Sequence, residues 1–162
     1  MNHALMVDLN TRLSQALGAP VQLELARVPS DIGFREFADT LRPRSGQSSV
    51  SYALPWVAVL ASSGCAAVGV DIEPLDRPVD PGIARFVLAP GESDADLLTL
   101  WTLKEAAYKA DPSSRDFTEY TTSQGRCLTP AGQTLRTTTL THNDLRISVA
   151  VCPHPKETDE PD

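Results

Sequence analysis

Three apolar runs follow one another closely in the first half of the chain, and they limit what it can fold into. They span residues 50–54, 56–61 and 66–72, and are separated by Pro55 and by the Ser-Ser-Gly segment at 62–64. Short apolar runs bounded by turn residues are typical of buried β-strands. We therefore predict consecutive strands, and we expect the second and third runs to form a hairpin that turns at the Ser-Ser-Gly segment.

The strongest helical pattern comes after these runs, over residues 94–110, and Asp111-Pro112 ends it because the residue before a proline disfavours the helical conformation. Asp94 is a candidate residue for its N-terminus. Further elements are expected early and late in the chain: helices over 8–17, 31–41 and 83–88, and strands over 21–28, 134–140 and 145–151. The turn between the last two strands is expected to hold Asn143 and Asp144. Strands, a helix and strands again predict an α+β fold, with an antiparallel sheet packed on helices.

The chain has 162 residues and 41% hydrophobic content, which suffices for one core. We expect a single domain over residues 1–152 and a disordered acidic tail over 153–162. A net charge of −7 without a basic stripe argues against a nucleic-acid partner. Three cysteines without CxxC spacing argue against a disulfide framework or a cysteine-rich zinc site. With no apolar run of about 18 residues and no leader, we expect a soluble, cytoplasmic protein without membrane contact.

Two carboxylates, Asp71 and Glu73, flank Ile72 where the third apolar run ends. Strand alternation places both on one face, while Val70 and Ile72 point to the core. Mg²⁺ takes oxygen ligands of this kind, so the pair is a candidate metal site. On this motif alone, a strand end that exposes two acidic residues to solvent is the more frequent explanation.

A second cluster of charged residues lies within the predicted helix over 94–110. Glu105 and Lys109 are four residues apart and share one side of the helix, and Lys104 is on its flank. A carboxylate near two lysines suits a site where a metal ion and a phosphate meet. Taken alone, an ordinary surface ion pair explains the same pattern.

Taken together, the segments resemble a known family. GVDIE at 69–73, ARFVLAPGE at 84–92 and WTLKEAAYKA at 101–110 occur in an order that is similar to the signature of the 4′-phosphopantetheinyl transferase superfamily. The likeness is to the larger single-chain type, which activates surfactin synthetase and other polyketide and nonribosomal peptide assembly lines of secondary metabolism. The resemblance implies a pseudo-dimer of two similar halves with coenzyme A bound between them.

The resemblance also implies a reaction: Mg²⁺-dependent transfer of the 4′-phosphopantetheine arm of coenzyme A to a serine of an acyl or peptidyl carrier protein. By position, Asp71, Glu73 and Glu105 would be the metal ligands, and Glu105 and Lys109 would be catalytic. Lys104 and Lys109 would hold coenzyme A phosphates.

The chain departs from the family pattern in two places. The family has a Ser-His pair that helps hold the nucleotide, whereas this chain has Ser51 and Tyr52, which become the corresponding cofactor-binding candidates. The first half, about 1–64, is short relative to the second, about 65–152, and self-association could restore the cleft. Two alternatives stay open: a catalytically degenerate relative that docks a carrier protein, and the same scaffold repurposed for another reaction.

Overall fold

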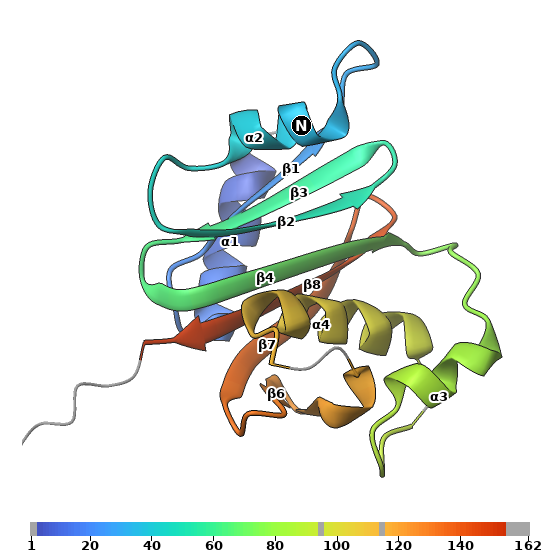
Figure 1. Ribbon diagram of the computed structural model, residues 1–162. Helices are drawn as coiled ribbons and strands as arrows, with labels where there is room; N and C mark the ends of the chain where they lie inside the picture. The colour runs from blue at the N-terminus through green and yellow to red at the C-terminus, as the bar shows by residue number, and fades with distance from the viewer. Residues whose placement is uncertain (1–2, 94–95, 114–115, 155–162) are drawn as a thin grey trace, which may run out of the picture.

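The computed structural model describes residues 3–93, 96–113 and 116–154, and two antiparallel sheets dominate it (Figure 1). The first sheet has the order β1-β3-β2, and the second has the order β4-β8-β7-β6-β5. The strands are β1 (Gln22–Arg27), β2 (Gln47–Ala53), β3 (Trp56–Ser62), β4 (Cys65–Pro74), β5 (Thr121–Ser123), β6 (Arg126–Leu128), β7 (Thr134–His142) and β8 (Leu145–Pro153). The helices are α1 (His3–Leu17), α2 (Phe34–Leu41), α3 (Ala84–Val87) and α4 (Leu97–Ala110), with 3₁₀ turns η1 (Pro81–Ile83) and η2 (Phe117–Glu119). The predicted α+β fold with antiparallel sheets on helices is confirmed.

The predicted hairpin of the second and third apolar runs is wrong. β3 pairs with β1 along one edge and with β2 along the other, so it has no free edge for a third partner. After Ser63 and Gly64 the chain therefore enters the second sheet, where β4 pairs with β8. The turn is held by Ser62, whose hydroxyl donates to Pro20 O at 2.6 Å and accepts from Gly64 N at 3.1 Å.

Two serine side chains of β2 join the first sheet to the second. The Ser49 hydroxyl accepts a hydrogen bond from Val70 N at 3.1 Å, and the Ser51 hydroxyl accepts one from Ile72 N at 3.3 Å. Both serines are buried, and both partners lie on β4. Since the pairing advances in the same direction on both strands, β2 and β4 run parallel, with side-chain hydroxyls in place of a backbone ladder.

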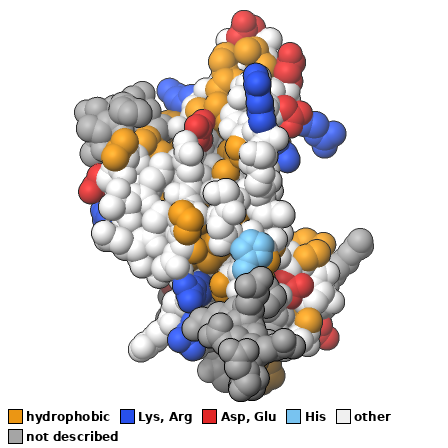
Figure 2. Space-filling view, turned by 90° about the vertical axis from the view of Figure 1, so that its left-hand side faces the viewer, with side chains coloured by type: hydrophobic (Ala, Val, Ile, Leu, Met, Phe, Trp, Pro, Cys, Tyr) orange, Lys and Arg blue, Asp and Glu red, His pale blue; other side chains and the backbone are white. Residues whose placement is uncertain are grey.

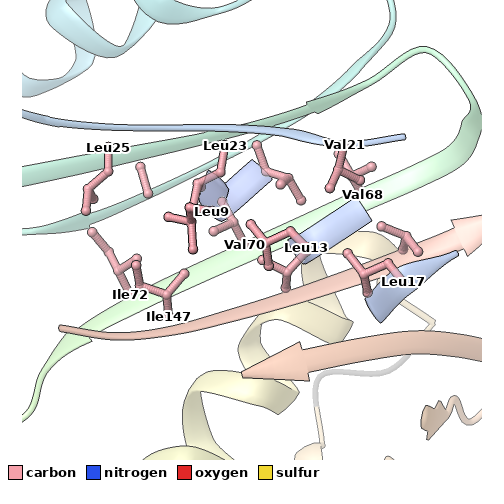
Figure 3. Close-up of a cluster of buried hydrophobic side chains, with 14 of the residues drawn as sticks. Leu9, Leu13, Leu17, Val21, Leu23, Leu25, Val68, Val70, Ile72 and Ile147 are labelled. Carbon is pink, nitrogen blue, oxygen red and sulfur yellow. The ribbon is translucent and has the colours of Figure 1, made fainter. Parts of the chain in front are cut away.

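The main hydrophobic core lies between α1 and the two sheets (Figure 3). Leu9, Leu13 and Leu17 of α1 are spaced at three to four residues, so they share one face of the helix. They pack against Val70 and Ile72 of β4 and other apolar strand residues. Because β4 alternates, its Gly69, Asp71 and Glu73 point to the opposite face, where α4 lies.

The C-terminal strands form the hairpin that the sequence predicts. Asn143 and Asp144 occupy the left-handed region at φ 49° and 58°, which suits a tight two-residue turn between twisted strands. The sequence did not indicate β5 and β6, which have three residues each. Helix α4 begins at Leu97 with Asp96 as its cap, whereas the candidate Asp94 lies outside the described residues, as does most of the expected acidic tail, from 155 on.

The surface carries both signs of charge. In the space-filling view of Figure 2, basic and acidic side chains are interspersed around a largely uncharged centre of the visible face. All three cysteines are buried and free. Among the described residues, no helix is both long and apolar enough to cross a bilayer.

Candidate functional site

Gly69 brings helix α4 directly onto strand β4. A Cβ atom at this position would stand 1.9 Å from Ala106 O and 2.9 Å from Ala110 N, and both are backbone atoms of α4. Only a glycine allows this approach, which places the last two turns of the helix over the strand. The Glu105 and Lys109 side chains consequently lie beside Asp71, two residues further along β4.

Asp71 is buried, and its two carboxylate oxygens have different surroundings. Oδ1 accepts hydrogen bonds from Ser51 Oγ and from Lys109 Nζ, both at 2.8 Å. Lys109 Nζ also donates to Val70 O at 3.0 Å. Oδ2 is buried and has no hydrogen-bond partner. A buried carboxylate oxygen is costly to leave without a partner, so this atom marks a place where a cation would be stabilised.

The other two acidic candidates border the same spot. Glu73 is partly buried and forms an ion pair with Arg77, four residues later. The pKa of Glu105 is raised, first by burial and then by the negative charge of Asp71, although Lys109 acts in the opposite direction. The influence of Asp71 and Glu73 on Glu105 shows that the three carboxylates form one electrostatic cluster.

The residues present fit a divalent cation by their chemistry. Three carboxylates supply the oxygen ligands that Mg²⁺ prefers, and Asp71 Oδ2 is an unpartnered atom among them. Over the described ranges, however, no group of three or more such side chains is arranged as a ready ligand set. Two of the carboxylates are already in ion pairs within the chain, because Lys109 pairs with Asp71 and Arg77 pairs with Glu73.

The placement of Lys104 does not support its predicted contact with coenzyme A. Its side chain is fully buried, and the ammonium donates to Val87 O at 2.5 Å, Phe117 O at 3.0 Å and Glu92 Oε2 at 2.6 Å. Glu92 in turn accepts hydrogen bonds from Thr122. All three donor positions of the ammonium are used, so Lys104 ties α4 to the segments around it and has none left for a phosphate.

A basic pocket of about 540 Å³ lies next to the acidic cluster, between α2 and the end of α4. Arg35, Arg42, Tyr52, Tyr108 and Lys109 contribute to its walls. Tyr52 is 44% exposed, and its ring makes an edge contact with Phe34, at 6.2 Å between ring centroids. The structure thus brings the candidates Tyr52 and Lys109 to one pocket.

Ser51 differs from its neighbour Tyr52. Strand alternation turns its side chain inward, where it is 5% exposed and its hydroxyl is engaged with Asp71 and Ile72. Of the two predicted cofactor-binding residues on β2, only Tyr52 therefore lines the pocket. The sequence pattern could not separate the two roles, because it showed a Ser-Tyr pair without the strand that packs against it.

Several site residues escaped the sequence reasoning. Arg77 forms an ion pair with Glu73, but their four-residue spacing would signal such a contact only within a helix, and here it joins the end of β4 to the loop after it. Ser148 is the register partner of Asp71 on β8, and its hydroxyl contacts Thr102 Oγ1 at 2.8 Å and Thr139 Oγ1 at 2.9 Å. These hydroxyls help fix α4 on the sheet, and nothing in their sequence spacing marked them.

A comparison with models of protein families gives a match. The model of the 4′-phosphopantetheinyl transferase superfamily matches residues 67–150, just over half of the chain, and this region includes every acidic and basic residue of the cluster. A search of curated proteins finds no match.

Proposed function

Because the chain belongs to the 4′-phosphopantetheinyl transferase superfamily, we propose that it transfers the 4′-phosphopantetheine arm of coenzyme A to a serine of an acyl or peptidyl carrier protein. In this proposal Asp71, Glu73 and Glu105 hold a magnesium ion. The observation that carries the proposal is the buried, unpartnered Oδ2 of Asp71 within a cluster of three carboxylates.

The pocket between α2 and α4 is the proposed binding site for coenzyme A. Its wall carries Arg35, Arg42 and Lys109 against one acidic residue, Asp39, and this excess of positive charge suits a ligand with several phosphates. Arg42 is held by Asp39 at 3.3 Å, which keeps its guanidinium at the pocket wall. Tyr52 can donate one hydrogen bond to a phosphate, although it brings no charge as a histidine would.

The reacting groups would meet where the pocket joins the cluster. The carrier serine oxygen attacks the pyrophosphate phosphorus next to pantetheine, and adenosine 3′,5′-bisphosphate leaves. A magnesium ion, when bound, neutralises charge on the pyrophosphate. In this proposal Glu105 also accepts the serine proton, because its carboxylate lies beside Asp71 in the acidic cluster. Lys109 can offset the charge that builds up on the leaving phosphate.

A second candidate function is favoured by a specific observation. Two of the three carboxylates are neutralised by Lys109 and Arg77, which suits a relative that docks a carrier protein without catalysing transfer. This alternative predicts that neither magnesium nor coenzyme A binds.

Calorimetric titration of coenzyme A with and without Mg²⁺ separates the two functions. If the chain is a transferase, it should bind coenzyme A, and Mg²⁺ should strengthen the binding. An apo carrier protein incubated with the chain, coenzyme A and Mg²⁺ should then increase in mass. Glu105→Gln and Asp71→Ala should abolish the mass increase while the fold is kept, and Glu119→Gln, the same change at an exposed residue, should not. Absence of coenzyme A binding in both conditions would overturn the transferase.

A further inference from the structure

Two buried serines of β2 have the same structural role but differ in one contact. Ser49 and Ser51 each accept a hydrogen bond from a backbone N–H of β4. Only Ser51 also donates a hydrogen bond to Asp71, at 2.8 Å. Comparing the two serines therefore separates the role that both have, which is to link the two sheets, from the contact with the acidic cluster that only Ser51 makes.

The geometry at Ser51 fixes the direction of its hydroxyl. A serine has one proton to donate, and here the Ile72 N–H occupies the acceptor side of the oxygen. The proton is accordingly directed to Asp71 Oδ1. Because Ser51 is 5% exposed, water does not compete for this bond.

The consequence for Asp71 is that its two oxygens are made unequal. Ser51 and Lys109 both donate to Oδ1, and Oδ2 is left buried without a partner. The terminal torsion of an aspartate is soft, so a carboxylate held by Lys109 alone could turn and present both oxygens to the ammonium. The hydrogen bond from Ser51 opposes this rotation.

We propose that Ser51 is a positioning residue for the metal site: it holds Asp71 so that Oδ2 stays available to a divalent cation. The proposal rests on the proposed function, because it presupposes a metal ion at Asp71. It replaces the expected contact of Ser51 with coenzyme A. Hydrogen bonds to metal-binding side chains typically contribute a factor of about 10–100 in metal affinity, so their loss is measurable.

The test measures Mn²⁺ binding, which is monitored through the electron paramagnetic resonance signal of the free ion. The full chain is titrated as wild type, Ser51→Ala and Ser49→Ala, in the absence of coenzyme A. Both variants lose one link between β2 and β4, so a similar loss of thermal stability is expected. Ser51→Ala should raise the Mn²⁺ dissociation constant about tenfold or more, whereas Ser49→Ala should leave it within about twofold. Since Ser49 also borders the basic pocket, the metal and not coenzyme A is the appropriate probe.

Three results would count against the proposal. An unchanged dissociation constant in Ser51→Ala, or an equal rise in both variants, overturns the role of Ser51 and leaves the proposed transferase intact. No Mn²⁺ binding by the wild type overturns the metal site and the role of Ser51 together. If Ser51→Ala does not fold, Ser51→Cys serves instead: its thiol is a weak donor of similar shape, and weakened Mn²⁺ binding is again the expected result.

Discussion

Replacing Gly69 with alanine tests the contact on which the whole site depends. The new Cβ would lie 1.9 Å from Ala106 O and 2.9 Å from Ala110 N, while ordinary contact begins at 3.4 Å. Both obstacles are backbone atoms, so no side-chain rotation relieves them, and α4 must withdraw from β4 by about 1.5 Å. Overpacking of this kind costs typically 1–3 kcal/mol, and we expect the upper end, about 3 kcal/mol of unfolding free energy.

Gly69→Ala should also impair transfer beyond its effect on stability. Withdrawal of α4 carries Glu105 and Lys109 away from Asp71, and a misplacement of about 1 Å can cost about 100-fold in rate. For a chain of this size a loss of about 3 kcal/mol corresponds to a melting temperature lower by about 6–12 °C. The measurements are thermal unfolding, and carrier-protein modification at a temperature where the variant is folded.

Gly33→Ala is the matched control for this substitution. Gly33 lies just before α2 with φ −69°, and a Cβ there has no neighbour within 4 Å. We expect its unfolding free energy to change by less than about 1 kcal/mol. If Gly69→Ala melts at the same temperature as Gly33→Ala, the close approach of α4 to β4 is wrong.

Three further predictions concern the buried ion pair and the basic pocket. Lys104→Met should lower the unfolding free energy by about 3–5 kcal/mol, because it leaves Glu92 buried without its cation. A loss below about 1 kcal/mol in denaturant unfolding would refute this. Burial raises the pKa of Glu92, but hydrogen bonds from Lys104 and Thr122 outweigh burial and leave it below its ordinary value of 4.5. The contribution of Glu92 to stability is then complete above pH 4.5 and is lost as the pH falls through the lowered pKa. The difference in unfolding free energy between the wild type and Glu92→Gln should therefore shrink in that range. A difference that stays constant with pH would contradict this prediction. Tyr52→His should tighten coenzyme A binding, because a histidine can bring positive charge to the pocket; equal affinity in calorimetry would show that Tyr52 does not face a phosphate.

Local patterns in the sequence were sufficient for most of the elements. Alternation predicted that Asp71 and Glu73 share a face of β4, and helical spacing predicted α4 with Glu105 and Lys109 on one side. The turn residues Asn143 and Asp144 predicted the last hairpin. These features depend on residues close together in the chain, so periodicity and turn chemistry are enough to indicate them.

Pairing between strands was harder to predict from the sequence. The apolar runs that became β3 and β4 are adjacent in sequence, and the chain offers a turn between them, yet they belong to different sheets. The choice depends on β1, β2 and β8, which occupy the available edges. The pattern of apolar residues within a strand does not indicate which distant segment the strand will pair with.

The sequence by itself therefore determined which charged residues the chain has to work with and which helix or strand carries each of them. The tertiary structure alone decided that Lys109 pairs with Asp71 while Lys104, five residues earlier in the same helix, pairs with Glu92. Each residue turns a helix by about 100°, so two lysines five positions apart point about 140° away from each other and cannot share a face, and both faces of α4 offered acidic partners. The contact of Gly69 with the α4 backbone fixes which side of the helix lies on β4, and it thereby decides which of the two lysines meets Asp71.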